Sequence, residues 1–178
     1  MAKPPETIET YRLRLRIPRL NDAEDVFRKY AQDPAVTKYV VWTPHKNVKE
    51  TKDFFRRCIQ YWGGEIAFPW VIELKTEREL LGMIELRMEK HRADMGYVIG
   101  RPYWGNGYAT EALKSIIDWV LTQNNIFRVW AVCDVENAAS ARVMEKAGMQ
   151  REGILHRYIV HPNISDQPRD CYCYSVEK

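Results

Sequence analysis

Two glycines at the start of a strongly apolar helix pattern form the first chemistry-bearing feature of the sequence. Gly105 and Gly107 lie in a turn between a strand that ends at Gly100 and a helix pattern that begins near Ala109. Backbone N–H groups at a helix start have no partner within the helix, and glycine lets the backbone approach a bulky anion. The spacing is typical of a phosphate-binding turn, and a strand-to-helix connection without a ligand has the same pattern.

Two common phosphate motifs do not fit this turn. A dinucleotide-binding G-x-G-x-x-G requires a third glycine where this chain has Thr110. A P-loop requires Gly-Lys followed by Ser or Thr, and the sequence contains no such tripeptide. The turn also follows a strand meander in mid-chain, whereas both motifs follow a first parallel strand.

The composition predicts one soluble domain over residues 1–178. The chain is 46% hydrophobic and 29% charged, which is enough apolar material for a core and excludes global disorder. No apolar run approaches the roughly 20 residues of a bilayer span, and the N-terminus lacks the apolar segment of a secretory signal. We therefore expect a cytoplasmic protein without a membrane partner.

The charge pattern does not favour nucleic acid as a partner. The 27 basic and 24 acidic residues leave a net charge of +3. Arg12, Arg14 and Arg16 alternate along one expected strand, and a solvent-facing strand side explains them. A small local excess of positive charge would instead suit one anionic small ligand.

The cysteines and histidines do not form a metal-binding pattern. Cys58, Cys133, Cys171 and Cys173 lack the paired spacing of zinc ligands, so we interpret them as reduced, structural thiols. His45 and His161 have no cysteine or acidic companion at ligand spacing, so we expect no metal.

Hydrophobic periodicity predicts seven strands and four helices in a mixed α+β fold. A helix with an Asn21 cap is expected to end at Pro34, and a second helix to be capped by Asn47. Strand 94–100, the helix that begins at Ala109 and strand 126–133 follow one another along the chain. This strand-helix-strand order predicts a right-handed parallel crossover. The expected strands are 11–17, 67–74, 80–88, 94–100, 126–133, 150–160 and 169–176, and the two later helices are 109–121 and 137–147.

Two blocks of the sequence resemble one family. The segment Trp104-Gly105-Asn106-Gly107-Tyr108-Ala109-Thr110-Glu111-Ala112 is similar to the acetyl-coenzyme A loop of the GNAT N-acetyltransferases, closest to the Rim-type ribosomal-protein branch. The segment from Asp134 to Met149 resembles the Asn-x-x-Ser helix of that branch. Both chain ends match as well, at Tyr11–Arg16 and from Arg169 to Tyr174.

The resemblance implies a GNAT fold and an acetyl-CoA-dependent activity. The fold would be a seven-stranded, mostly antiparallel twisted sheet with a splayed parallel pair and four flanking helices. Acetyl-CoA would be the cosubstrate, with its pyrophosphate on the glycine turn and its pantetheine arm in the splay, where strand groups can pair with its amides. The implied cofactor-binding residues are Trp104, Gly105, Asn106, Gly107, Tyr108, Ala109, Val98, Ile99, Asn137, Ser140, Arg142 and Lys146. Arg142 and Lys146 have a second interpretation as solvent-facing helix charges.

The sequence also departs from the family pattern at positions that bear on catalysis. Pro102 replaces the usual Gln or Arg before the loop and offers no N–H. Met144 stands where many members have a tyrosine acid, so Ser140 is the expected proton donor, with Tyr174 in reserve. Glu85 or Asp94 would accept the amine's proton. A backbone N–H within 96–98 would stabilise the oxyanion.

The acceptor of the acetyl group stays open at this stage. A protein N-terminal α-amine and a small amine both fit the resemblance. Tyr39, Trp42, His45 and Tyr158, together with His161, are expected to line the acceptor mouth. A non-catalytic acyl-CoA-binding sensor or interaction module is the alternative function, and both a monomer and a homodimer are compatible with the sequence.

Overall fold

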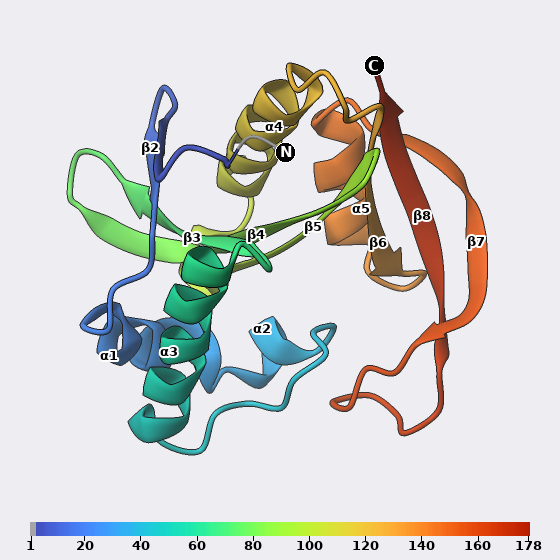
Figure 1. Ribbon diagram of the computed structural model, residues 1–178. Coiled ribbons are helices and arrows are strands. Elements are labelled where there is room, and N and C mark those ends of the chain that lie inside the picture. The colour runs from blue at the N-terminus through green and yellow to red at the C-terminus, as the bar shows by residue number, and fades with distance from the viewer. Residues whose placement is uncertain (1–2) are drawn as a thin grey trace.

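A twisted sheet of eight strands runs through the molecule (Figure 1). The computed structural model describes residues 3–178. The strand order is β1-β2-β3-β4-β5-β6-β8-β7, and every neighbouring pair is antiparallel except β5 with β6. The strands are β1 (Thr7–Glu9), β2 (Leu13–Arg16), β3 (Phe68–Leu74), β4 (Glu79–Glu89), β5 (Arg92–Ile99), β6 (Arg128–Asp134), β7 (Gln150–Ile159) and β8 (Arg169–Glu177).

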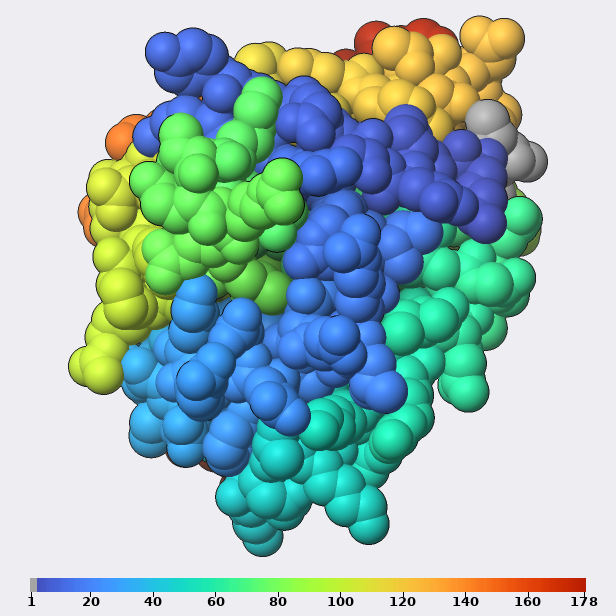
Figure 2. Space-filling model, turned by 90° about the vertical axis from the view of Figure 1, so that its left-hand side faces the viewer, coloured from blue at the N-terminus to red at the C-terminus, as the bar shows by residue number. Residues whose placement is uncertain are grey.

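Helices cover both faces of the sheet (Figure 1). One face carries α1 (Asp22–Val26) with its π-helical continuation η1 (Phe27–Ala31), the short α2 (Pro34–Thr37) and α3 (Val48–Gly64). The other carries α4 (Tyr108–Leu121), which follows the 3-10 turn η2 (Arg101–Tyr103), and α5 (Ala138–Lys146). Figure 2 shows the first of these layers from outside, with the segments up to α3 in blue and teal.

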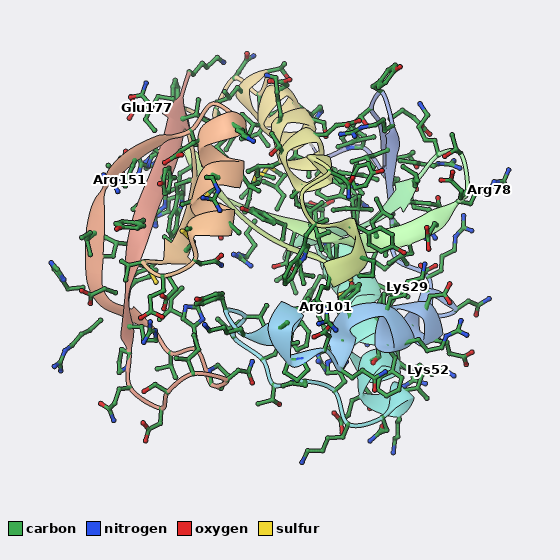
Figure 3. All side chains as sticks on the ribbon, turned by 180° about the vertical axis from the view of Figure 1, so that it is seen from behind. Lys29, Lys52, Arg78, Arg101, Arg151 and Glu177 are labelled. Atoms are coloured by element: carbon green, nitrogen blue, oxygen red, sulfur yellow. The ribbon has the colours of Figure 1, made fainter. Side chains whose placement is uncertain are left out.

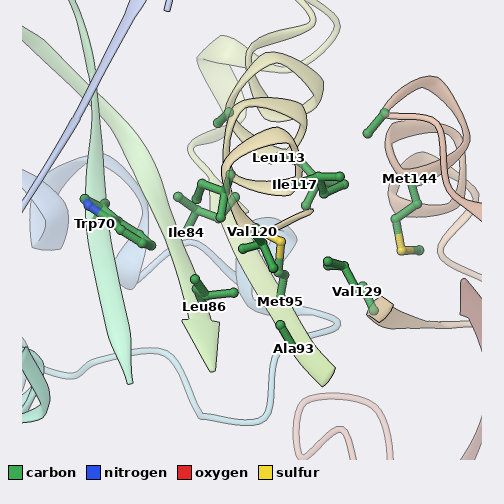
Figure 4. Packing of buried hydrophobic residues seen from close by; sticks show 14 of the residues in the cluster. Trp70, Ile84, Leu86, Ala93, Met95, Leu113, Ile117, Val120, Val129 and Met144 are labelled. Carbon is green, nitrogen blue, oxygen red and sulfur yellow. The ribbon is translucent and has the colours of Figure 1, made fainter. Parts of the chain in front are cut away.

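The main core lies between α4 and the centre of the sheet. Leu113, Ile117 and Val120 follow helical spacing and are at most 3% exposed, so one stripe of α4 is fully covered. Figure 4 shows this stripe facing Ile84 and Met95 of the strands. A second apolar cluster between α1, α3 and the opposite sheet face includes Val26, Phe55, Cys58, Val71 and Met83.

The parallel strands β5 and β6 separate soon after they begin. Their pairing covers only Arg92 with Arg128, Ala93 with Val129 and Asp94 with Trp130. From Met95 onward β5 pairs with β4 alone, and from Ala131 onward β6 pairs with β8 alone. The facing strand edges beyond this point therefore have backbone groups that can accept an added, extended ligand.

The structure confirms the mixed α/β fold and corrects its details. The expected first strand is preceded by a short additional one, because a turn at Thr10 folds β1 back on β2, with Thr10 N–H donating to Leu13 O at 2.9 Å. Pro34 begins a helix rather than ending one, since the Asp33 side chain accepts from Ala35 N–H and proline suits the first helical turn. Asn21 makes no capping hydrogen bond, whereas Asn47 caps α3 as expected.

The described residues contain no helix that combines the length and apolarity needed to cross a membrane. All four cysteines are free and buried, in agreement with their interpretation as structural thiols.

Candidate functional site

The glycine turn has the local geometry expected of an anion-binding helix start. Gly105 and Gly107 adopt φ values of 78° and 79°, in the left-handed region that favours glycine. Gly107 is the N-cap of α4, and no side chain accepts from the N–H groups of the first turn. Those donors and the positive end of the helix dipole therefore remain available to an anion.

The turn is held in place by hydrogen bonds to its backbone. Trp104 Nε1 donates to Ile99 O at 2.7 Å, and Asn106 Nδ2 donates to Tyr103 O and Trp104 O at 3.2 and 3.1 Å. Arg12 Nη1 donates to Asn106 O at 3.0 Å. The side chain and the carbonyl of Asn106 are thus engaged, which leaves its backbone N–H to face a ligand.

Arg12 and Glu111 connect the turn to the N-terminal strands. Glu111 accepts from Thr10 Oγ1 at 2.6 Å, from Arg12 N–H at 2.8 Å and from Arg12 Nε at 2.7 Å. Burial opposes ionisation of Glu111, but these hydrogen bonds outweigh it and lower the pKa of the carboxyl. The Arg12 guanidinium also stacks over Tyr108 at 4.5 Å.

The expected solvent-facing role of the alternating arginines was therefore wrong for Arg16 and incomplete for Arg12, whose side chain is 37% exposed. Arg12 holds the glycine turn, and Arg16 is 9% exposed and paired with Asp22 and Glu73. Only Arg14, with a side chain 47% exposed, matches the expectation. Alternation along a strand identifies a shared face, but partners from distant segments decide whether that face meets water.

A hydrogen bond spans the gap between the separated strands. Ser140, in the first turn of α5, has its Oγ 2.7 Å from the hydroxyl of Tyr97 on β5. Asn137 caps α5 by accepting from Ser140 N–H at 3.2 Å, which fixes the position of that serine. Burial raises the pKa of Tyr97, so its hydroxyl stays protonated at neutral pH. The sequence reasoning missed Tyr97, although strand alternation places it on the same face as Met95.

The reserve proton donor is engaged elsewhere. Tyr174 is 1% exposed and donates to Glu145 at 2.9 Å. Glu145 follows Ser140 by five residues on α5, a rise of about 7 Å. Burial together with Glu145 raises the pKa of Tyr174 to about 12. Tyr174 therefore contacts the other end of α5 from Ser140, and its role as the reserve proton donor stays a prediction.

The two candidate carboxylates lie on the opposite face of the sheet from α4. Glu85 pairs in register with Gly96, and Asp94 pairs with Arg87. Arg87 forms ion pairs with both carboxylates, whose side chains are 26% and 25% exposed. Solvent can therefore reach both acids beside the strand that separates from β6.

The expected acceptor-mouth residues fall into three groups. Trp42 and His45 stack at 5.1 Å and line one small cavity. Tyr39 packs edge-on against the buried His161 at 6.2 Å, and its hydroxyl donates to Glu136 O at 3.4 Å. Tyr158 is 45% exposed on β7 and forms no hydrogen bond with the others.

Two contacts that the sequence reasoning missed position the loop between α2 and α3. Asn163, from the β7–β8 connection, donates to Thr37 O at 2.6 Å and to Trp42 O at 2.8 Å. Arg101 pairs with Asp33 at 3.0 Å, and Figure 3 shows its side chain beside α2. Asn163 thereby attaches the C-terminal hairpin to the end of α2 and the loop that follows it, and Arg101 attaches the segment before the glycine turn to the start of α2.

The remaining cofactor candidates are the two basic residues of α5. Arg142 and Lys146 are exposed, and within residues 3–178 neither has an ion-pair partner. The same part of the chain contains no group of three His, Cys, Asp or Glu side chains arranged to hold a metal ion.

Comparison with known proteins identifies the family to which this architecture belongs. Residues 12–150 match the model of the acetyltransferase (GNAT) domain. The chain belongs to the GNAT acetyltransferase family. It is an acetyl-CoA-dependent acyltransferase of that family, as the resemblance implied.

Individual GNAT relatives agree with this assignment. A Bacillus licheniformis protein described as "uncharacterized N-acetyltransferase p20" is 36% identical over 156 residues, covering 86% of this chain and 87% of its own. The crystal structure of a GNAT acetyltransferase from Bacillus anthracis is 29% identical, with a TM-score of 0.83 and coverage of 96% and 98%.

The Rim-type branch is represented among similar folds. RimL, a ribosomal-protein α-N-acetyltransferase solved with coenzyme A, has a TM-score of 0.84 over 97% of this chain and 98% of its own. At 19% identity it shows a shared fold.

Proposed function

We propose that this GNAT protein transfers the acetyl group of acetyl-CoA to a primary amine by direct attack in a ternary complex. The acceptor is a protein N-terminal α-amine or a small amine. The observation that carries the proposal is the juxtaposition of three features: an uncapped glycine turn, a separated β5–β6 pair and the Tyr97–Ser140 bond across that gap.

The cofactor would bind mainly through the backbone. The N–H groups of residues 104–109 would hold the pyrophosphate, and exposed Arg142 and Lys146 would supply positive charge. The pantetheine arm would extend along Val98 and Ile99, with Asn137 at the far side of the gap.

The attacking amine must first lose a proton, because an ammonium group has no lone pair. Glu85 and Asp94 are partly exposed carboxylates beside Gly96, so either can accept that proton directly or through water. Arg87, which bridges them, would orient both carboxylates.

The tetrahedral intermediate and the leaving thiolate require donors. A backbone N–H within 96–98 would face the developing oxyanion. Ser140 would donate its proton to the departing sulfur, the Tyr97 hydroxyl would donate a hydrogen bond to the serine oxygen, and a proton from solvent would restore Ser140.

Release of free thiol tests this proposal. The protein is mixed with acetyl-CoA and a broad panel of amines and peptides, and thiol release that depends on an acceptor is the expected result. Ser140→Ala should slow that release without abolishing CoA binding. Tight CoA binding with no turnover over the whole panel would refute the enzymatic function and favour an acyl-CoA-binding module.

A further inference from the structure

An unfilled position on β5 faces the acceptor side of the sheet. Gly96 lies directly across from Glu85, and a Cβ built on it would have no atom within 4 Å. Its backbone does not adopt a positive φ, so the conformation does not require glycine. Gly82 on the neighbouring strand is different, because a Cβ there would lie 2.1 Å from Val98 O. The sheet therefore requires Gly82, whereas at Gly96 the missing side chain leaves open space beside a carboxylate.

A small apolar cavity lies one step along the same face. Met83 and Val98 form the next same-face pair after Glu85 and Gly96, about 7 Å along the strands. Both residues line a cavity of about 50 Å³. The other lining residues are Val26, Tyr30, Ala31, Trp42, His45 and Phe54.

The cavity lining contains no carboxylate, lysine or arginine. His45 is the one titratable nitrogen base in it, and burial lowers its pKa, so the ring is neutral at pH 7. A charged group entering this cavity would lose its water without gaining an ionic partner, which is strongly unfavourable. An apolar group would instead gain contacts with the aromatic rings of Trp42 and Phe54.

The size of the cavity limits what can enter. An apolar protein cavity of about 150 Å³ accommodates benzene. A cavity of one third of that volume suits an aliphatic group of about two to three carbons.

We propose that Gly96 and the cavity lined by Met83 and Val98 form the acceptor subsite, with the amine over Gly96 beside Glu85 and a small aliphatic substituent in the cavity. This inference rests on the proposed function and narrows it. The favoured acceptors are primary amines that carry an ethyl or isopropyl group next to the amine-bearing carbon. Polyamines and amines with a charged group at that position are disfavoured.

A series of amino-acid amides that differ only in the side chain tests the subsite. We expect kcat/KM for 2-aminobutanamide and valinamide to exceed that for glycinamide by about tenfold, since each buried methylene adds a several-fold gain. Lysinamide, the α-amide of aspartic acid, whose side-chain carboxyl is free, and spermidine should be poor acceptors. Equal rates across the series, or the highest rate with spermidine, would overturn this inference and leave the acetyltransferase proposal intact.

Two variants locate the subsite. Phe54→Ala enlarges the cavity and should shift the preference toward leucinamide and phenylalaninamide. Tyr61→Ala is the matched control, because Tyr61 is a partly buried aromatic on the same helix that does not line the cavity.

Gly96→Val fills the open space and should raise the KM for valinamide at least tenfold while the affinity for CoA stays unchanged. An unchanged amide preference in Phe54→Ala, or an unchanged KM in Gly96→Val, would contradict the placement.

Binding measured without turnover tests the acceptor subsite separately from the acetyltransferase activity. Each amide is titrated calorimetrically into the protein saturated with CoA, which carries no acetyl group. Binding of valinamide that Gly96→Val removes supports the subsite, even where no acetylation occurs and the enzymatic proposal fails. Absence of both binding and turnover with every amide refutes the subsite, whereas only the broad panel of amines and peptides decides the acetyltransferase proposal.

Discussion

The two sides of the candidate site are built in different ways. The proposed cofactor side is one contiguous turn, Trp104 to Ala109, which offers backbone N–H donors and whose shape depends on two glycines. The proposed acceptor side is a cavity lined by side chains from α1 and η1, α3, the connection after α2 and two strands. A ligand that every family member shares can be held by backbone, whereas a ligand that differs between members has to be recognised by side chains.

The two sides also differ in how they are held. Arg12 and Glu111 fix the cofactor turn, with a guanidinium, a carboxylate and a backbone N–H in one cluster. On the proposed acceptor side, the amide of Asn163 holds the loop that carries Trp42, and the ion pair between Arg101 and Asp33 holds the start of the preceding helix α2. Changes on the first side should therefore affect CoA affinity, and changes on the second should affect the KM for the amine.

The largest effect is expected from Gly107→Val. Valine resists a φ of 79°, and its side chain would crowd an anion at the helix start. CoA affinity should fall by more than about 100-fold in calorimetric titration. Gly153→Val is the control, because Gly153 lies in β7 with no atom within 4 Å of its Cβ position and no positive φ. A folded Gly107→Val protein with unchanged affinity would show that the turn does not bind the cofactor.

Ser140→Ala should lower kcat by about 10- to 100-fold while the CoA dissociation constant stays within about twofold. A thiolate is a good leaving group, so the effect lies at the low end for general acid catalysis. Tyr97→Phe should lower kcat less, since the serine hydroxyl remains.

Ser115→Ala provides the comparison for Ser140→Ala, because its hydroxyl donates to Ala112 O within α4. Steady-state kinetics at saturating acetyl-CoA measure these effects. An unchanged kcat in Ser140→Ala would place the proton donor elsewhere.

Asn163→Ala should raise the KM for the amine about tenfold and leave CoA affinity unchanged. The substitution removes both hydrogen bonds to the loop that carries Trp42, and the two carbonyl groups lose a buried partner. Asn125→Ala is a matched control, because Asn125 donates to one exposed carbonyl, that of Lys90. If CoA affinity falls together with amine affinity, the two sides are not independent.

The smallest effect is expected from Glu111→Gln. Hydrogen bonds from Thr10 and Arg12 outweigh burial and hold the pKa of Glu111 below its ordinary 4.5 in the folded chain. The carboxylate therefore stabilises the fold above about pH 4.5, and this contribution is lost as the pH falls through the lowered pKa. The variant should lose about 1 kcal/mol of unfolding free energy at pH 7.

Urea unfolding as a function of pH measures the effect of Glu111→Gln. The difference from the unmodified chain should shrink as the pH falls from 4.5 through the lowered pKa of Glu111, where the glutamate becomes neutral like the glutamine. Glu9→Gln, in an ion pair with both side chains about half exposed, should change the free energy very little. A difference for Glu111→Gln that does not depend on pH would mean that the ionised carboxylate is not the stabilising form.

The fold was predicted correctly where residues within one segment determine the structure of that segment. The apolar stripe of α4, the Asn47 cap and the meander through β3, β4 and β5 follow from short-range periodicity and capping chemistry. The prediction was wrong where contacts with residues far away in the sequence determine the local structure. The turn at Thr10 is reinforced by the hydrogen bond to Glu111, 101 residues away, and Arg16 is buried because Asp22 and Glu73 neutralise it.

The sequence by itself determined the cofactor turn, because glycine conformations, helix-start donors and capping side chains depend on neighbours a few residues away. Only the tertiary structure decided that Tyr97 meets Ser140, that Gly96 lies open beside Glu85, and that Asn163 holds a loop 126 residues earlier in the chain. These contacts depend on strand register and on how separate segments pack. Neither is set by local dihedral preference, so the acceptor side emerges only when the whole chain is folded.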